Sequence, residues 1–178
     1  GENAQVAHPR LFRRIWERKK KDPSVKIIVC QPRKTRTPTI ADLWLPVDPG
    51  KDLAICHAIA KELLKNNAQD TAYINKRARI TDGEKTYTID EYKDYLKQYD
   101  ADTVAKLTRC PAQNIRQAAE WFAKSGATMS LWCMGLNQRS RGVWANNLVH
   151  NLHLLTGNFG KPGADSFSLT GQPHACGG

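Results

Sequence analysis

The chain has 178 residues, enough for one domain with a substantial buried core. Its composition, 40% hydrophobic and 25% charged, is typical of globular proteins, and no apolar stretch is long enough for a membrane-spanning helix. Lysine and arginine outnumber aspartate and glutamate by 27 to 17, and this net charge of +10 favours a polyanionic partner or a phosphate-bearing ligand.

The first part of the chain alternates between predicted helices and predicted strands. A helix over His8–Lys20 places apolar residues at helical spacing, with Pro9 in its first turn. Val25–Cys30 is mostly apolar, as expected of a strand buried on both faces. Asp42–Val47 is a second, shorter strand candidate. The next helix begins at Asp52, which is either its N-cap, the interpretation we favour, or a hydrogen-bond acceptor for a nucleotide base.

A more polar segment follows this helix. Residues 66–100 are predicted to form an appended, more variable helical subregion, within which Thr88–Glu91 matches a capping box. A further helix begins at Cys110-Pro111 and ends at Gly126.

The last part of the chain contains a third strand candidate, Thr128–Met134. Arg141–Leu155 has the spacing of a helix, which Thr156-Gly157 closes in a glycine C-cap pattern. The remainder, residues 158–178, is predicted as glycine-rich loop.

Short apolar strands that alternate with helices predict an α/β fold, namely a Rossmann-like doubly wound parallel sheet flanked by helices. We expect one parallel sheet to contain both Val25–Cys30 and Thr128–Cys133, with the helices His8–Lys20 and Arg141–Leu155 packed against it. The strand that normally precedes the first turn of such a sheet is missing before Gly1, so the predicted sheet is incomplete at its N-terminal strand.

In such sheets, ligands bind outside the carboxyl ends of the strands. The three predicted ends are Gln31–Thr35, Asp48–Asp52 and Met134–Gln138, all of them rich in polar, glycine or proline residues. This topology predicts a nucleotide-type site. Neither a GxGxxG fingerprint nor a Walker-type loop is present in the sequence to support it.

Two cations stand at the first of these ends. Arg33 suits bidentate contact with phosphate and stacking on a base, and Lys34 adds a second positive charge. We predict that Arg33, Lys34, Asp52, Met134 and Gln138 converge on one cleft.

No catalytic or metal-binding residue is predicted in this chain. The cysteines have no CxxC spacing and are odd in number, so we interpret most of them as buried small hydrophobes. His150 and His153 lie three residues apart on a helix, but packed or exposed histidines are favoured over metal ligands. The sequence contains no GxSxG motif, so hydrolysis is unsupported. The cysteines are Cys30, Cys56, Cys110, Cys133 and Cys176.

Several segments near the C-terminal end carry a resemblance to a known family. They are Leu131–Gln138, Gly142–Leu148, Asn151–Gly157, Pro162-Gly163 and Phe167–Pro173. Together they resemble the catalytic subunit of periplasmic-type dissimilatory nitrate reductases, within the dimethyl sulfoxide reductase family of molybdopterin oxidoreductases. The resemblance spans nearly the whole chain, with residues 66–100 its least characteristic part.

The resemblance implies reduction of nitrate to nitrite at a molybdenum held by two molybdopterin guanine dinucleotides. Residues 1–178 then form a dinucleotide-binding domain, with Met134 and Gln138 nearer the pterin. Many relatives carry aspartate where this chain has Gln31, which puts the recognition of ribose or guanine at that position in doubt. The implied cofactor-binding residues are Gly1, Asn3, Gln31, Arg33, Lys34, Thr35, Gly50, Lys51, Asp52, Met134, Gly135 and Gln138.

Other parts of the family pattern lie outside this sequence. They are the cysteine motif for a four-iron four-sulfur cluster, the cysteine that ligates molybdenum and the C-terminal pterin-binding domain. The resemblance therefore implies one part of a larger enzyme, inactive alone, whose partners are the remaining domains and a cytochrome electron donor. It also implies a periplasmic location. The first ten residues show no secretory signal, so a cytoplasmic location stays open.

Two alternative functions remain. One is another enzyme of the same family, such as a formate dehydrogenase or an assimilatory nitrate reductase, against which Trp132–Met134 and Trp144–Asn147 favour the dissimilatory type. The other is a basic nucleic-acid-binding domain. Nucleic acid is not the expected partner, because the aromatic residues do not alternate with the cations as single-strand binding requires.

Overall fold

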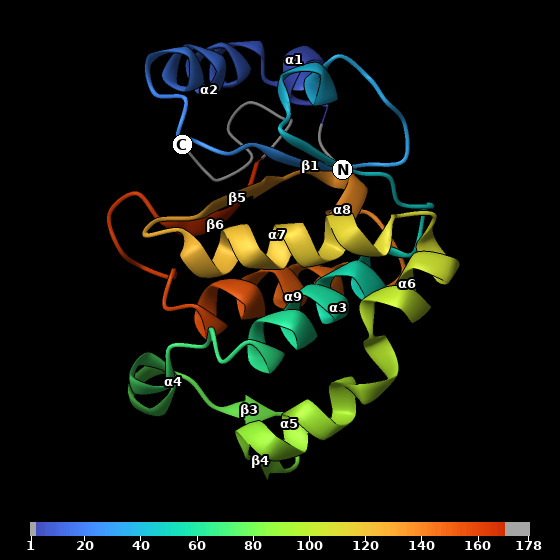
Figure 1. The fold of residues 1–178 in the computed structure, drawn as a ribbon, viewed down its shortest axis with the longest axis vertical. Coiled ribbons are helices and arrows are strands. Elements are labelled where there is room, and N and C mark those ends of the chain that lie inside the picture. The colour runs from blue at the N-terminus through green and yellow to red at the C-terminus, as the bar shows by residue number, and fades with distance from the viewer. Residues whose placement is uncertain (1–2, 170–178) are drawn as a thin grey trace.

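The computed structural model describes residues 3–169 of the chain. Figure 1 shows the arrangement of its helices and strands, with the 3-10 helices labelled η in the text. In chain order the elements are α1 (Ala4–Ala7), α2 (Pro9–Lys21), β1 (Ile28–Cys30), η1 (Thr37–Ile40), β2 (Leu43–Leu45), α3 (Asp52–Lys65), α4 (Thr71–Arg77), β3 (Ile80–Thr81), β4 (Thr86–Tyr87), α5 (Ile89–Tyr95), η2 (Leu96–Tyr99), α6 (Ala101–Thr108), α7 (Ala112–Lys124), β5 (Met129–Trp132), α8 (Met134–Asn137), α9 (Gly142–Leu155) and β6 (Asp165–Ser168).

The strands β1, β5 and β6 lie between helices on two sides. Figure 1 shows α1 and α2 above them and α7, α9 and α3 below. β1 pairs with β2 in parallel, with Ile28 opposite Leu43, and β5 pairs with β6 in parallel, with Met129 opposite Asp165. The predicted α/β class with parallel strands flanked by helices is therefore confirmed.

The prediction that β1 and β5 share one sheet was wrong. Their hydrogen bonds divide them between two separate two-stranded sheets, one formed by β1 and β2 and the other by β5 and β6. The sequence analysis also treated residues 165–168 as loop, although they form β6. The sequence Asp-Ser-Phe-Ser has no apolar run, so the strand is defined by its backbone pairing with β5 and not by a local pattern.

The predicted helices are confirmed with shifts of one or two residues at their ends. α2 and α9 match the two long helices expected to flank the strands, and Gly157 closes α9 with a φ of +62°. Thr88 and Glu91 form the predicted capping box. The segment 66–100 also holds a short antiparallel hairpin, β3–β4, which the sequence did not indicate.

The core is built around α3. This helix packs against α7 and α9, and its inward face is almost fully buried at Ile55, Ala58 and Leu63. Ile115 of α7 and Leu152 of α9 complete the same hydrophobic cluster. Most of the hydrophobic burial thus lies below the strands, where it holds α3 and the turn that precedes it in place.

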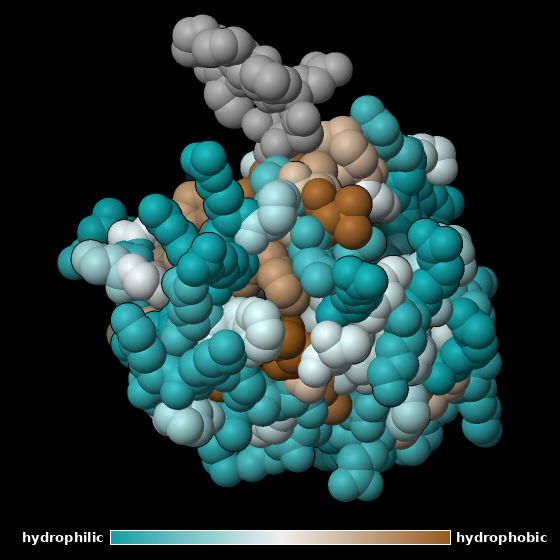
Figure 2. Space-filling model, turned by 90° about the horizontal axis from the view of Figure 1, so that it is seen from above, coloured by the Kyte–Doolittle hydropathy of each residue, from teal (hydrophilic) through white to brown (hydrophobic). Residues whose placement is uncertain are grey.

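The opposite side carries α2 (Figure 1), whose last turn is basic at Arg18, Lys19, Lys20 and Lys21. In Figure 2, hydrophilic residues cover most of the face seen from above, and hydrophobic residues reach the surface only in a narrow band between them.

Within residues 3–169, no helix combines the length and apolarity needed to cross a membrane.

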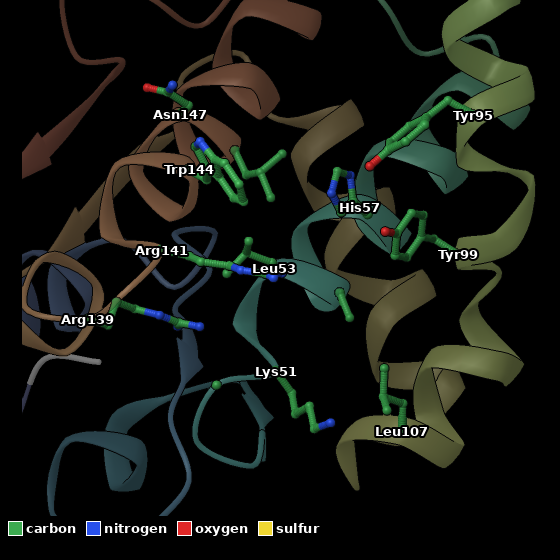
Figure 3. Close-up of a pocket in the computed structure, with 13 residues that line it drawn as sticks. Lys51, Leu53, His57, Tyr95, Tyr99, Leu107, Arg139, Arg141, Trp144 and Asn147 are labelled. Carbon is green, nitrogen blue, oxygen red and sulfur yellow. The ribbon is translucent and has the colours of Figure 1, made fainter. Parts of the chain in front are cut away.

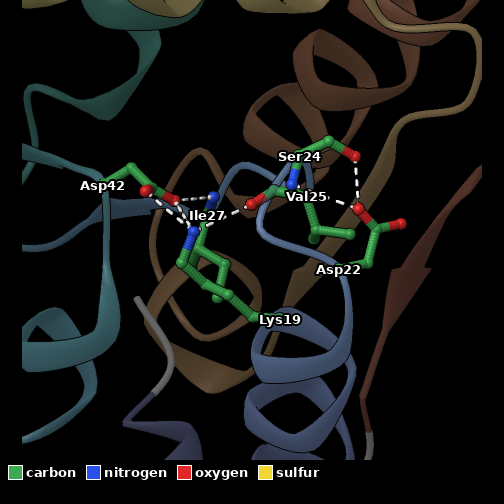
Figure 4. Close-up of polar contacts among 6 residues, drawn as sticks. All are labelled: Lys19, Asp22, Ser24, Val25, Ile27 and Asp42. Atoms are coloured by element: carbon green, nitrogen blue, oxygen red, sulfur yellow. Dashed lines mark hydrogen bonds and ion pairs between the residues drawn. The ribbon is translucent and has the colours of Figure 1, made fainter.

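A polar junction fixes the end of α2 to the β1–β2 pair. The ammonium group of Lys19 donates to the carbonyl of Val25 at 2.9 Å and to both carboxylate oxygens of Asp42 at 2.8 Å (Figure 4). Asp42 also accepts a hydrogen bond from the Ile27 amide at 2.8 Å. The junction sets the position at which β1 enters its sheet, and so where the loop after β1 emerges.

Replacing Asp42 with asparagine is expected to reduce the loss of stability in acid. Partial burial raises the pKa of Asp42, but hydrogen bonds from Lys19 and Ile27 outweigh it and hold the pKa below its ordinary value. A depressed pKa in the folded state stabilises the protein above the unfolded pKa, and this contribution is lost as pH falls through the folded value.

Urea unfolding of the wild type and Asp42→Asn at pH 7 and at pH 3 measures this effect. The difference between their free energies of unfolding should shrink in acid. Asp90→Asn, at an exposed ion pair with Lys93, is the control and should have little effect at either pH. A difference for Asp42→Asn that is independent of pH would contradict the assignment.

Candidate functional site

The loop after β1 folds back onto the start of α1 through a chain of side-chain hydrogen bonds. Gln31, only 5% exposed, donates to the Arg33 carbonyl at 2.6 Å and to the Thr35 hydroxyl at 2.8 Å. Thr35 then donates to the Asn3 side-chain carbonyl at 3.3 Å, and Thr37 donates to the same oxygen at 3.0 Å. Three predicted site residues, Asn3, Gln31 and Thr35, are therefore held together; Gly1 lies outside the described residues.

Arg33 and Lys34 lie on the outer side of this loop. Both are exposed, and neither forms an ion pair within residues 3–169. The Lys34 ammonium lies 5.7 Å from the centre of the Trp44 ring, whose indole donates to the Gln31 carbonyl at 3.1 Å. The buried side-chain amide of Gln31 thus shapes the loop, while the side chains of Arg33 and Lys34 remain available to an anionic ligand.

Asp52 is not the N-cap of α3. Lys51 holds that position and Asp52 is the first residue of the helix. The Asp52 carboxylate forms an ion pair with the guanidinium of Arg139, and both side chains are less than one-fifth exposed. A charged partner brought near by the tertiary fold competes better for this carboxylate than the local backbone amides do. The pair joins the turn after β2 to the segment after β5.

The other predicted residues near β5 lie on or beside α8. Met134 and Gly135 begin this short helix and are exposed, and the amide of Gln138 donates to the Met134 carbonyl at 2.8 Å. A side chain at Gly142 would collide with the carbonyl oxygen of Asn137, 2.3 Å from an added Cβ. The glycine therefore permits the tight corner between α8 and α9 that carries Arg139.

Two features indicate that the strand ends have room for a ligand. The side-chain oxygen of Gln5 is buried and has no hydrogen-bond partner among residues 3–169. Gly50 has a φ of +85°, and no described atom lies within 4 Å of the place where its Cβ would be. An unsatisfied acceptor and an open glycine turn fit a ligand that donates hydrogen bonds and approaches the backbone closely.

A cleft of about 460 Å³ lies beside this site (Figure 3). Gly50 and Lys51 line it, together with Arg139 and Arg141. The sequence analysis missed both arginines, although their position just after a strand-end turn resembles that of Arg33 and Lys34. The convergence of Arg33, Lys34, Asp52, Met134 and Gln138 on a single cleft stays a prediction.

Three of the described cysteines, Cys30, Cys56 and Cys110, are poor nucleophiles. Burial raises the pKa of the Cys56 thiol to about 12 and that of Cys110 to about 11, and it raises the pKa of Cys30 further. Thiols with such pKa values stay protonated at neutral pH. Within residues 3–169 these three, like Cys133, are free of disulfides.

The paired histidines of α9 are hydrogen-bonded inside the fold. His150 contacts the Ser166 hydroxyl at 2.6 Å, and His153 contacts Ser130 at 2.8 Å and the Asn158 carbonyl at 3.2 Å. These contacts give both rings hydrogen-bond partners within the fold. In the described part of the chain, His, Cys, Asp and Glu form no group of three or more that is suited to hold a metal ion.

Comparison with known proteins identifies the family. The model of the molybdopterin oxidoreductase family matches residues 1–177, so the chain belongs to that family. It is 50% identical, over its whole length, to a periplasmic nitrate reductase from Desulfovibrio desulfuricans, and 43% identical, over 99% of its length, to a nitrate reductase from Symbiobacterium thermophilum. In each case the chain spans only 24% of the relative's length. The resemblance found in the sequence is thereby confirmed.

A solved structure supports the fold. The chain is similar to acetylene hydratase from Pelobacter acetylenicus, with a TM-score of 0.69 over 82% of this chain and 19% of that one. The sequences are 24% identical, so this likeness supports the arrangement of helices and strands and carries nothing about the reaction.

Proposed function

We propose that this chain is the dinucleotide-binding part of a molybdenum-dependent nitrate reductase that reduces nitrate to nitrite. The hydrogen-bonded loop formed by Asn3, Gln31 and Thr35 at the end of β1 carries the proposal. It presents two cations that form no ion pair within residues 3–169, at a strand end, where α/β sheets bind nucleotides. The buried side-chain oxygen of Gln5 on α1 has no hydrogen-bond partner within the same residues. Because both relatives are named nitrate reductases, nitrate is favoured over formate as the substrate.

The residues at the strand ends then divide the recognition of one molybdopterin guanine dinucleotide. Arg33, Lys34 and Lys51 contribute positive charge towards its phosphates, and the open turn at Gly50 lets the backbone approach them. Gln31 and Asp52 place their side-chain amide and carboxylate beside the guanine nucleotide end of the cofactor. Met134, Gly135 and Gln138 face the pterin end. When bound, the cofactor supplies the molybdenum at which the oxygen of nitrate is removed.

The rest of the proposed enzyme lies in further polypeptide. Both relatives are about four times as long as this chain, which leaves room for the molybdenum-ligating cysteine, the four-iron four-sulfur cluster and a second dinucleotide-binding wall. Electrons arrive from a partner such as a cytochrome. The name of the Desulfovibrio relative favours a periplasmic location.

Calorimetric titration of the chain with guanosine monophosphate tests the nucleotide role. Gln31→Ala removes the amide that shapes the loop and leaves the Thr35 hydroxyl without its donor. If the ligand binds only the loop as it is shaped by this amide, the cost of restoring that shape, about 1–3 kcal/mol, is taken from the binding free energy, so binding should weaken by about fivefold to 150-fold.

Gln117→Ala is the matched control, because Gln117 also bonds through its Nε2, but to Glu120 on an exposed helix face at 2.9 Å. It should leave the affinity unchanged. Equal affinities of the wild type and Gln31→Ala would remove the loop after β1 from the nucleotide site.

A further inference from the structure

The cleft beside the strand ends is strongly cationic. Lys51, Arg139 and Arg141 line it, and no acidic side chain does so in the described part of the chain (Figure 3). Arg139 is paired with Asp52, whereas Lys51 and Arg141 form no ion pair within residues 3–169. The cleft therefore has uncompensated positive charge, which favours an anionic occupant.

Large apolar side chains surround the same cleft and are unusually exposed. Trp144 is 59% exposed, Tyr95 50% and Leu107 46%, and Val143 beside Trp144 is 74% exposed. They come from three separate helices, α9, α5 and α6. We call this surface the Trp144 cleft. A rim of exposed apolar residues around a polar centre is typical of an interaction site, and tryptophan, tyrosine and arginine are the residues that dominate binding energy at interfaces.

The inner wall of the Trp144 cleft is aromatic and neutral. His57 stacks on Tyr99 with ring centroids 4.4 Å apart and contacts Tyr95 edge-on at 5.6 Å. Burial lowers the pKa of His57 to about 4, so the ring carries no charge at neutral pH. Arg139 is paired with Asp52 and the proposed function assigns Lys51 to the cofactor phosphates, so the positive charge left for this occupant comes from Arg141, while the aromatic wall offers a surface for an apolar group.

We propose that the Trp144 cleft is the docking surface for an acidic segment with an apolar anchor side chain, contributed by further polypeptide of the same enzyme. The inference rests on the proposed function, because relatives about four times as long carry additional chain that must pack against this part. Because the cleft is positively charged, the segment that docks there must carry negative charge. A polypeptide is also large enough to cover Trp144 and Leu107 together, two exposed side chains that line the cleft.

Hydroxyl-radical footprinting of tryptophan tests the docking. It compares the isolated chain with a chimera in which this chain replaces the matched quarter of the Desulfovibrio desulfuricans reductase. Both Trp144 and Trp16, which is 42% exposed, should react in the isolated chain. In the chimera Trp144 should lose its reactivity while Trp16 keeps it, and buried Trp132 should stay protected in both as a check of folding.

Charge reversal provides a matched pair of variants. Arg141 lies over the Trp144 ring at 5.4 Å, and Lys20 lies over the Trp16 ring at 3.9 Å. Arg141→Glu in the chimera should restore the reactivity of Trp144, whereas Lys20→Glu should leave it protected. A folded chimera with fully reactive Trp144 overturns the proposal. If the folded chimera has a reactive Trp144 and still contains guanine nucleotide, only the docking inference fails. If Trp144 is protected but the folded chimera contains no guanine nucleotide, only the proposed function is contradicted.

If Trp132 is reactive in the chimera, the chimera has not folded. A titration of the isolated chain then tests whether the Trp144 cleft binds an acidic segment. The probe is a synthetic glutamate-rich peptide with one central phenylalanine, and the readout is the indole NMR signals, with that of Trp144 identified by Trp144→Phe. The signal of Trp144 should shift and that of Trp16 should not. Equal shifts, or none, would overturn the proposal.

Discussion

Replacing Leu63 with alanine is expected to destabilise the chain by about 2–5 kcal/mol. Leu63 is 1% exposed and lies on α3, whose inner face packs against both α7 and α9. The substitution removes buried methyl groups and leaves a cavity between α3, α7 and α9, which these packed helices cannot shift enough to fill. Because domains of this size are stable by only about 5–15 kcal/mol, a large share of the folding free energy is lost.

Urea unfolding followed by circular dichroism measures the effect. Leu107→Ala is the matched control, since it removes the same groups from a side chain that is 46% exposed on α6. It should cost less than about 1 kcal/mol. Similar losses for the two variants would mean that the core is not centred on α3.

Replacing Arg139 with alanine is expected to destabilise the chain by about 1–3 kcal/mol, below the range for a fully buried ion pair because this pair is partly exposed. The substitution leaves the carboxylate of Asp52 without its partner in a site where it is 17% exposed. It also disconnects the turn after β2 from the segment after β5. Both effects follow from a single contact between residues 87 positions apart.

A double-mutant cycle with Asp52→Asn isolates this interaction. The double variant should cost clearly less than the sum of the single variants, by about 1 kcal/mol or more. The pair Lys97 and Asp94 is the control, because its side chains are 75% and 69% exposed and a surface pair contributes about 0–1 kcal/mol. Strict additivity for Asp52 and Arg139 would contradict the coupling of the two segments.

Local patterns in the sequence were sufficient to predict α2, α3, α5, α7 and α9, whereas α1, α4, α6 and α8 were not predicted. Helical spacing located α2 and α9, a capping box marked the start of α5 and a glycine marked the end of α9. Strand pairing was not predictable in the same way. β6 has no apolar signal and forms because β5 pairs with it, and the division into separate sheets depends on contacts between distant segments.

The candidate site shows the same limit. Topology and family resemblance indicated the loop from Gln31 to Thr35, whose internal hydrogen bonds connect neighbours in sequence. Asp52 was assigned to a local capping role because nothing near it in sequence reveals Arg139. The Trp144 cleft was missed for the same reason, since its walls come from four segments that only the tertiary structure brings together.

We propose that this chain forms one wall of the site for a molybdopterin guanine dinucleotide in a nitrate reductase. The most direct test is an analysis of the chimera for molybdenum and guanine. We expect the chimera to contain bound molybdenum, to release about two guanosine monophosphates in acid for each metal, and to reduce nitrate with reduced viologen. The isolated chain should retain little molybdenum and show no turnover, because it supplies too few of the contacts. A folded chimera that lacks the nucleotide, or an isolated chain with stoichiometric molybdenum and turnover, would contradict the account.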